Sequence, residues 1–213
     1  QSSLKNLNSA ADLLKHRGPD KVGTHSNPYL FCKFFRLKIL DLSDLAMQPM
    51  TDINKNYLLI FNGEIYNFKD LNSSYLSDKK FNLNSDTSTL FNMLIKYEEK
   101  ALNYIDGMFS FVFFDLRKKK IIFARDRFGI KPLYYKSEKN NFIFSSEIKP
   151  ILKFENDKTI NQKAVIDFFL KGSMDHDEKT FFKSVKSLCP GQYGVIKKNE
   201  LKINKYWSLI NKK

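Results

Sequence analysis

The chain has 213 residues, of which 42% are hydrophobic and 15% aromatic, so a disordered protein is excluded and one large domain with a single core is expected. The formal net charge is +13, but the 36 Lys and Arg residues are spread along the chain, which argues against a nucleic-acid partner. No apolar run is long enough to cross a membrane, no signal peptide is visible, and the two distant cysteines do not predict a disulfide, so we expect a cytoplasmic protein.

The predicted elements are helices and strands in irregular alternation. In the first half, the pattern predicts a helix over 4–15, one or two strands over 29–40, a strand over 57–60, a short helix over 69–76 and a helix from 85–87 to about residue 104. In the second half it predicts a hairpin of 108–115 and 120–125, strands near 133–135 and 142–145, helices over 147–153 and 162–171, and a hairpin of 193–197 and 201–206. Such an order, without regular βαβ units, indicates an α+β layered fold.

The stretch Phe-Asn-Gly-Glu-Ile-Tyr-Asn at 61–67 follows an apolar run and is predicted to be a strand end that meets a turn. Gly63 can adopt a positive φ, and Asn62 offers a side-chain amide beside the Gly63 backbone N–H. Two neutral donors that converge in this way can hold a developing oxyanion. Asn-Gly is also the strongest short hairpin signal, and this pair alone favours the hairpin turn.

Nine short motifs follow one another along the chain. They are His-Arg-Gly-Pro-Asp at 16–20, Arg-Leu at 36–37, the 61–67 stretch, Ser-Asp-Thr at 85–87, Asp-Gly-Met-Phe at 106–109, the stretch 124–135, Ser-Ser-Glu-Ile-Lys at 145–149, Cys-Pro-Gly at 189–191 and Tyr-Trp at 206–207. In this order they resemble the class II glutamine amidotransferase domain of glutamine-hydrolysing asparagine synthetases, over residues 4–207. The stretches 16–20 and 127–135 favour this branch over the amidotransferases that make glucosamine phosphate or phosphoribosylamine.

The resemblance implies a four-layer αββα sandwich of the N-terminal nucleophile hydrolase type. It implies an N-terminal cysteine that hydrolyses glutamine to glutamate and ammonia, using its thiol as nucleophile and its own α-amine as base. No cofactor and no metal are implied for this domain. A downstream synthetase domain would use ATP and Mg²⁺ to amidate aspartate with the ammonia, and a homodimer is left open.

The resemblance also assigns roles to individual residues. The Asn62 amide and the Gly63 N–H would form the oxyanion hole, while Asp86, with Glu64 beside it, would take the ammonium of glutamine. Arg36 would hold the glutamine α-carboxylate, a task that suits a bidentate guanidinium. The strand expected to line the substrate pocket consists of Arg36, Leu37, Lys38, Ile39 and Leu40.

Each of these residues also has a structural interpretation. Asp86 can simply cap the helix that it opens, and Arg36 can form a structural ion pair. Asp126 and Arg127 are expected to be structural in either case. The three histidines stand in no metal-ligand spacing.

The chain departs from the family pattern in three places. It begins at Gln1 and contains no Cys-Gly start, and its cysteines, Cys32 and Cys189, have no free amine. Ser88 stands where the family usually carries Glu, and no Ser-Gly-Gly pyrophosphate loop for ATP is present. We therefore expect a domain truncated at its N-terminus, inactive alone, with 208–213 beginning the linker to a synthetase domain. The alternatives are an amidotransferase of the same branch that serves another acceptor, as in cell-surface sugar modification, and a non-catalytic module.

Overall fold

The computed structural model describes residues 2–37, 47–77, 85–138, 141–155, 157–172 and 177–209. Its α-helices are α1 (Ser2–Ala11), α2 (Phe68–Tyr75), α3 (Asp86–Tyr97), α4 (Ile148–Glu155) and α5 (Gln162–Lys171), and the 3₁₀ helices η1 (Asp12–Arg17) and η3 (Glu98–Asn103) follow α1 and α3. Its strands are β1 (Lys21–Asn27), β2 (Leu30–Arg36), β3 (Met50–Thr51), β4 (Tyr57–Ile65), β5 (Gly107–Asp115), β6 (Lys120–Arg125), β7 (Tyr134–Glu138), β8 (Asn141–Ser145), β9 (Lys186–Ser187), β10 (Gln192–Lys197) and β11 (Glu200–Lys205). The predicted helices and hairpins are confirmed to within a few residues, whereas β1 was not predicted.

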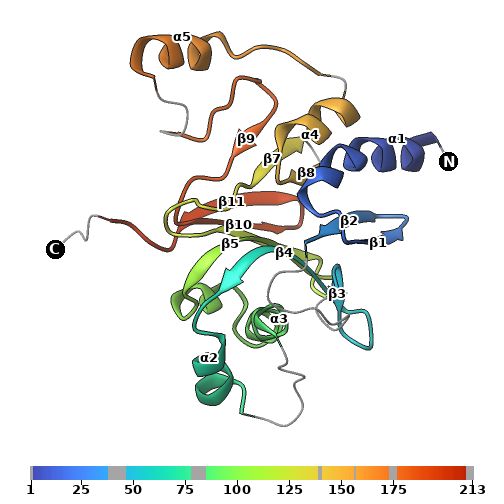
Figure 1. Ribbon diagram of the computed structural model, residues 1–213, viewed down its shortest axis with the longest axis vertical. Helices are drawn as coiled ribbons and strands as arrows, with labels where there is room; N and C mark the ends of the chain where they lie inside the picture. The colour runs from blue at the N-terminus through green and yellow to red at the C-terminus, as the bar shows by residue number, and fades with distance from the viewer. Residues whose placement is uncertain are drawn as a thin grey trace.

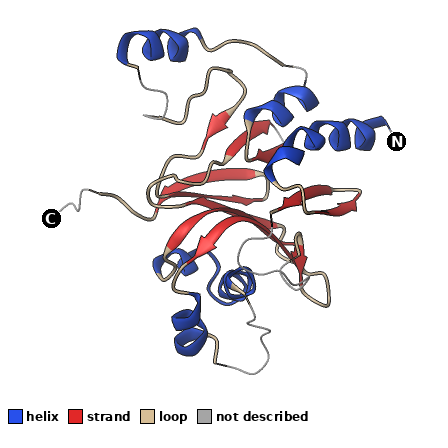
Figure 2. Ribbon diagram, viewed as in Figure 1, coloured by secondary structure: helices blue, strands red, loops and turns tan. Residues whose placement is uncertain are grey.

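The strands form two layers, as Figure 2 shows. One layer is a six-stranded antiparallel sheet in the order β11-β10-β6-β5-β4-β3. The other layer is split into the hairpin β1-β2 and the three-stranded sheet β8-β7-β9. In Figure 1, α1 and α4 lie on one side of the strands, while α2 and α3 lie on the other. The predicted α+β fold with αββα layering is therefore confirmed.

Alternate residues of β5 explain how two separate cores form. Phe109, Phe111 and Phe113 face the cluster that includes the apolar residues of α2 and α3. Val112 and Phe114 face the second cluster, which joins the six-stranded sheet to the residues of β2, β7 and β8. Because both faces of β5 are buried, its sequence shows little alternation of apolar and polar residues.

The loop after β6 is fixed by Asp126, which is 1% exposed. Its carboxylate accepts hydrogen bonds from the backbone N–H groups of Phe109 (3.2 Å), Phe128 (3.0 Å), Ile130 (3.0 Å) and Lys131 (2.9 Å). A carboxylate has enough lone pairs for four such donors, and burial strengthens each of the four bonds. This one side chain therefore joins the start of β5 to the Arg-Phe-Gly-Ile-Lys-Pro loop.

None of the helices within the described residues is long and apolar enough to span a membrane.

Replacing Asp126 by Ala should destabilise the domain strongly, because four backbone donors lose one acceptor. Each buried donor left unpaired costs about 1–3 kcal/mol, so we expect a loss of at least about 3 kcal/mol, measured by urea denaturation. The matched control is Arg127→Ala, which removes an ion pair to Asp106 whose side chains are 34% and 61% exposed. That control should change stability by less than about 1 kcal/mol. Equal losses in the two variants would contradict the role given to Asp126.

Candidate active site

Asn62 and Gly63 lie inside β4, where they pair with Ser110 and Phe109 of β5. The prediction of a strand end that meets a turn is confirmed for the stretch 61–67, because β4 ends at Ile65 and a turn follows at 66–67. The hairpin turn at Asn62-Gly63 was wrong, since both residues are part of the strand. Gly63 has φ +150°, and a Cβ at this position would lie 2.1 Å from the carbonyl oxygen of Met108. The glycine is thus needed for the close approach of β5 and not for a turn, because cross-strand pairing overrides the local Asn-Gly preference.

The Phe109 backbone shows which way Gly63 faces. The Phe109 N–H donates to the Asp126 carboxylate, and its carbonyl accepts from the Asp126 N–H at 2.7 Å, so both groups point away from β4. In an antiparallel pair, opposed residues either exchange both hydrogen bonds or exchange none. Gly63 and Phe109 are therefore a non-hydrogen-bonded pair, and the Gly63 N–H points away from β5.

The residues two positions on either side of Gly63 confirm this direction. The Phe61 N–H donates to Gln48 Oε1 at 2.6 Å, and the Ile65 N–H donates to Asp86 Oδ2 at 3.1 Å. Strand β3 pairs only with Leu58 and Leu59, so it ends before Gly63. The Gly63 N–H therefore points to the edge of β4 away from β5, between the side chains of Gln48 and Asp86, where no strand of the described ranges pairs with it.

The side-chain amide of Asn62 is an unusual donor. Its Nδ2 atom is buried without a hydrogen-bond partner, the one such side-chain nitrogen or oxygen in the part of the chain that the structure describes. Ser110, directly opposite Asn62, donates its hydroxyl hydrogen to the carbonyl of Pro132 at 3.0 Å. A buried unpaired donor costs about 1–3 kcal/mol and is rare in native proteins, so a site for a ligand acceptor is its simplest explanation.

Arg36 ends β2 and is 4% exposed, opposite Lys21 of β1. Its carbonyl accepts from the Asp20 N–H at 3.1 Å, and a Cβ on Gly18 would lie 2.2 Å from the Phe35 carbonyl oxygen. The His-Arg-Gly-Pro-Asp motif therefore packs directly on the end of β2, and only a glycine at residue 18 allows this contact. The motif holds the Arg36 backbone in place, and both interpretations of its guanidinium stay open.

Asp86 is the first residue of α3, and the cap of this helix is Ser85. Ser85 and Ser88 form a capping box, in which Ser85 Oγ accepts from the Ser88 N–H at 3.1 Å and Ser88 Oγ accepts from the Ser85 N–H at 3.0 Å. The interpretation of Asp86 as the cap was therefore wrong. Ser88 completes the capping box and is 9% exposed.

The Asp86 carboxylate joins α3 to the edge of β4. Its Oδ2 accepts from Ile65, as above, and its Oδ1 accepts from the Thr87 N–H at 2.6 Å. This places a carboxylate two residues along the strand from the Gly63 N–H. Glu64 lies between them on β4, opposite Met108 and on the same face as Asn62.

The structure thus brings together Asn62, Gly63, Glu64 and Asp86, and holds Arg36 on the β1-β2 hairpin. Leu37 follows β2 and is 53% exposed. Lys38, Ile39 and Leu40, which were predicted to line the pocket, lie outside the described residues.

Gln48 was missed by the sequence analysis, which gave it no role. It is 5% exposed, and its amide accepts from the Phe61 N–H and donates to the Phe61 carbonyl at 3.0 Å. The side chain thus continues β3 along the edge of β4. A Cβ on Gly23 of β1 would lie 1.8 Å from the Gln48 carbonyl oxygen, so the β1-β2 hairpin that carries Arg36 touches this edge. A lone Gln before Pro carries no sequence signal for such a role.

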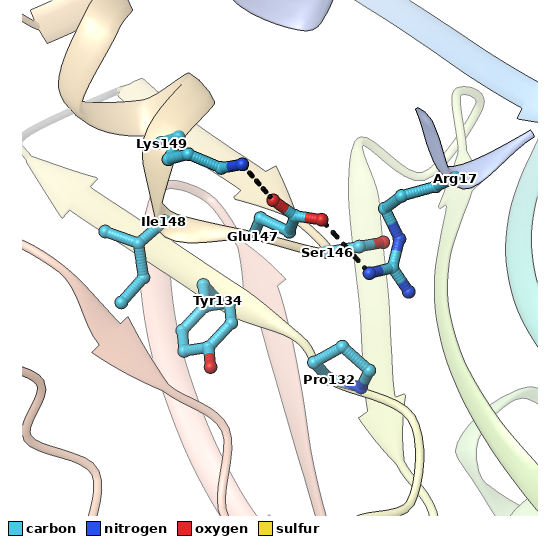
Figure 3. Close-up of a pocket in the computed structure, with 7 residues that line it drawn as sticks. All are labelled: Arg17, Pro132, Tyr134, Ser146, Glu147, Ile148 and Lys149. Carbon is cyan, nitrogen blue, oxygen red and sulfur yellow. Dashed lines mark hydrogen bonds and ion pairs between the residues drawn. The ribbon is translucent and has the colours of Figure 1, made fainter. Parts of the chain in front are cut away.

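A pocket of about 340 Å³ lies beside the second strand layer, between η1 and the start of α4. Figure 3 shows Arg17, Tyr134 and Glu147 among the residues that line it. Glu147 is bonded to His16 (2.6 Å), Arg17 (3.2 Å) and Lys149 (3.0 Å). Burial acts to raise the pKa of Glu147, but the hydrogen bonds from Lys149, His16 and Arg17 outweigh it and lower the pKa to about 2. The ionised carboxylate therefore ties the His-Arg-Gly-Pro-Asp motif to α4.

The two cysteines are poor nucleophiles. Burial raises the pKa of the Cys32 thiol to about 12, and burial with the nearby Glu178 also raises the pKa of Cys189. Because the thiolate is the reactive form, neither residue is activated. Among the described residues, no group of three or more His, Cys, Asp or Glu side chains could hold a metal ion.

The αββα layering is that of the N-terminal nucleophile hydrolase fold, and the buried, unpaired donor on β4 marks the candidate site within it. Residues 1–207 match the sequence profile described as "Glutamine amidotransferase domain", and the chain therefore belongs to that family. Asparagine synthetase [glutamine-hydrolyzing] 2 of Bacillus subtilis (strain 168) is 38% identical over 213 aligned positions, gaps included, and the match covers 95% of this chain and 28% of the relative. Asparagine synthetase [glutamine-hydrolyzing] 3 of the same organism is 30% identical, over 97% of this chain and 34% of the relative. The chain thus spans about a third of the length of these relatives.

Solved structures support the fold. The "allosteric regulatory enzyme of purine biosynthesis" superposes with a TM-score of 0.59 at 17% identity, covering 84% of this chain and 35% of the other. Glutamine phosphoribosylpyrophosphate (PRPP) amidotransferase from B. subtilis gives a TM-score of 0.54 at 18% identity, with the same coverage of 84% and 35%. The predicted family and fold are therefore confirmed.

Replacing Asp86 by Asn should weaken the junction of α3 and β4, because an amide has one acceptor oxygen for two backbone donors. We expect a loss of about 1–3 kcal/mol and a midpoint lower by several degrees in thermal denaturation. Asp70→Asn is the matched control, since Asp70 is also an acid in the first turn of a helix but is exposed. An Asp86→Asn variant as stable as this control would show that the two hydrogen bonds contribute nothing.

Proposed function

We propose that this glutamine amidotransferase domain hydrolyses glutamine to glutamate and ammonia in the cytoplasm, and that a downstream domain uses the ammonia to amidate aspartate with ATP and Mg²⁺. The observation that carries the hydrolytic part is the Asn62 Nδ2, which has no partner among the described residues and lies one residue before an N–H that points to the edge of β4 away from β5. The asparagine synthetases among the relatives support aspartate as the acceptor of the ammonia. Relatives named Amidase chry2 of Gibberella zeae, at 32% identity, and Amidase chyE of Penicillium rubens, at 31%, favour a different acceptor as the second candidate.

In this proposal, a thiol attacks the carbonyl carbon of the side-chain amide of glutamine, and the oxygen of that carbonyl becomes an oxyanion. Asn62 Nδ2 and the Gly63 N–H would donate to this oxygen, and the contact would strengthen as charge develops. Ammonia leaves with the proton that the α-amine took from the thiol, and water then hydrolyses the thioester to glutamate. Arg36 would bind the α-carboxylate of the substrate, while Asp86 and Glu64 would bind its ammonium.

The nucleophile is the N-terminal cysteine that the family resemblance implies, and it is not among residues 1–213. We propose that it precedes Gln1 in an extended segment. The split second layer supports this position, because β2 and β8 each have one edge with no strand partner in the described ranges. The 340 Å³ pocket lies at the same split, lined by Arg17 and by Glu147 just after β8. A strand placed there would face the Asn62 side of the six-stranded sheet.

The chain of residues 1–213 should release no ammonia from glutamine, whereas the full-length protein should. The physical reason is that Cys32 and Cys189 have raised pKa values and lack the adjacent amine. A coupled glutamate assay on both proteins, with Cys32→Ser and Cys189→Ser as controls in the full-length protein, tests this. Glutaminase activity in the 213-residue chain, or its loss in either cysteine control, would contradict the proposed nucleophile.

In the full-length protein, Arg36→Ala and Asn62→Ala should affect different kinetic constants. Arg36→Ala should raise the KM for glutamine, because carboxylate binding is equal in the ground and transition states. Asn62→Ala should lower kcat by about 100-fold, since it removes one oxyanion donor worth about 3 kcal/mol. Asn141→Ala, at an exposed position of β8, is the control that should alter neither constant. Effects of both substitutions on KM alone would reject the assignment of Asn62.

A further inference from the structure

Helix α5 exposes a contiguous apolar stripe. Ile166 is 56% exposed, Phe169 80% and Leu170 78%. Their spacing of three and four residues places all three side chains on one face of the helix. Figure 1 shows α5 at the periphery of the molecule, away from the six-stranded sheet. We call Ile166, Phe169 and Leu170 the outer stripe.

The opposite face of α5 already packs on the domain. Phe168 meets Phe181 edge to face, with ring centroids 5.5 Å apart. The start of the helix is tied down by an antiparallel bridge between Ile160 and Phe182 and by a hydrogen bond from the Asn161 N–H to the Phe181 carbonyl at 2.8 Å. The outer stripe is therefore a second apolar face and not the one that holds the helix to the domain.

A helix that is apolar on both faces is normally buried on both faces. With 10 residues, α5 is also too short to be stable by itself, although Asn161 caps its start and Gly172 ends it in the left-handed conformation. Large exposed apolar side chains that cluster on one ordered element mark an interaction site. The outer stripe thus has the properties of a docking surface.

The charge of the chain decides which partner fits. Lys163 flanks the stripe on an exposed position, and Lys171 flanks it in an ion pair with Asp167 at 3.1 Å. The formal net charge of the chain is +13. Two copies that meet through this face would bring lysines and like net charges together, which disfavours a homodimer here.

The two Bacillus subtilis relatives have about two thirds of their length outside the matched part. A domain of the same polypeptide meets the stripe at high effective concentration.

We propose that the outer stripe of α5 docks into an apolar, acid-rimmed surface of the ammonia-accepting domain of the same polypeptide. The proposal takes the existence of that domain from the proposed function and adds the surface by which the two domains hold together. Glutamine hydrolysis at Asn62 does not depend on it. The transfer of ammonia does, because ammonia released between undocked domains is diluted into water.

Hydrogen exchange of the α5 backbone, compared between the full-length protein and residues 1–213, is the first test. Docking should slow exchange over 164–171 at least tenfold in the full-length protein. The double variant Phe169→Ser/Leu170→Ser should abolish this protection, whereas Tyr29→Ser, at a 98% exposed aromatic residue between β1 and β2, should not. Equal exchange in the two wild-type proteins would overturn the proposal.

Product analysis is the second test, made on the same full-length variants. Phe169→Ser/Leu170→Ser should leave glutamate release unchanged and lower the fraction of ammonia that reaches the amidated product at least fivefold. Unchanged coupling would overturn the docking proposal. Sedimentation that shows residues 1–213 dimerising through Phe169, or binding of the chain to anionic phosphatidylserine vesicles through it, would also overturn it. Absence of glutamate release in the wild-type full-length protein would instead contradict the proposed function, and the exchange test would still decide the docking.

Discussion

The pairing of β4 with β5 at Gly63 is the constraint on which the candidate site depends. Asp126 holds both backbone groups of Phe109 on the side away from β4, and this leaves the opposed Gly63 unable to exchange hydrogen bonds with β5. The Gly63 N–H is therefore directed to the sheet edge by an interaction on the far side of the neighbouring strand. A carboxylate in the loop after β6 thus orients a donor two strands away.

The same region keeps a second donor unpaired. Ser110 is the cross-strand neighbour of Asn62, but its hydroxyl hydrogen is committed to Pro132, in the loop that Asp126 and Arg125 hold in place. A buried amide without a partner lowers the stability of the domain, and the well-packed cores on both faces of β5 offset that loss. Many of the hydrogen bonds and apolar contacts described here therefore lie in β4, β5 and the loop 126–132, next to the Asn62 amide and the Gly63 N–H.

Much of this fold was predictable, and the reasons are local. Helix α5 was predicted with its observed ends, and in the structure Asn161 caps its start and Gly172 ends it. The β5-β6 hairpin was predicted because its apolar runs flank a polar turn. The Asn62-Gly63 pair was assigned to a turn because the local signal is strong, and only the partner strand shows that it is extended. Roles that rest on contacts between distant segments, such as those of Gln48 and Asp86, could not be derived from spacing. The ordered motifs, in contrast, identified the family without any geometry.

We propose above that Asn62 Nδ2 and the Gly63 N–H are the oxyanion donors of the site. A crystal structure of the full-length protein with the γ-aldehyde analogue of glutamine, which forms a tetrahedral adduct with a thiol, tests it most directly. The account predicts that the adduct oxygen lies about 2.7–3.1 Å from both nitrogens. An adduct oxygen that points to solvent, or an Asn62 amide that is bonded to the protein in that complex, would contradict it.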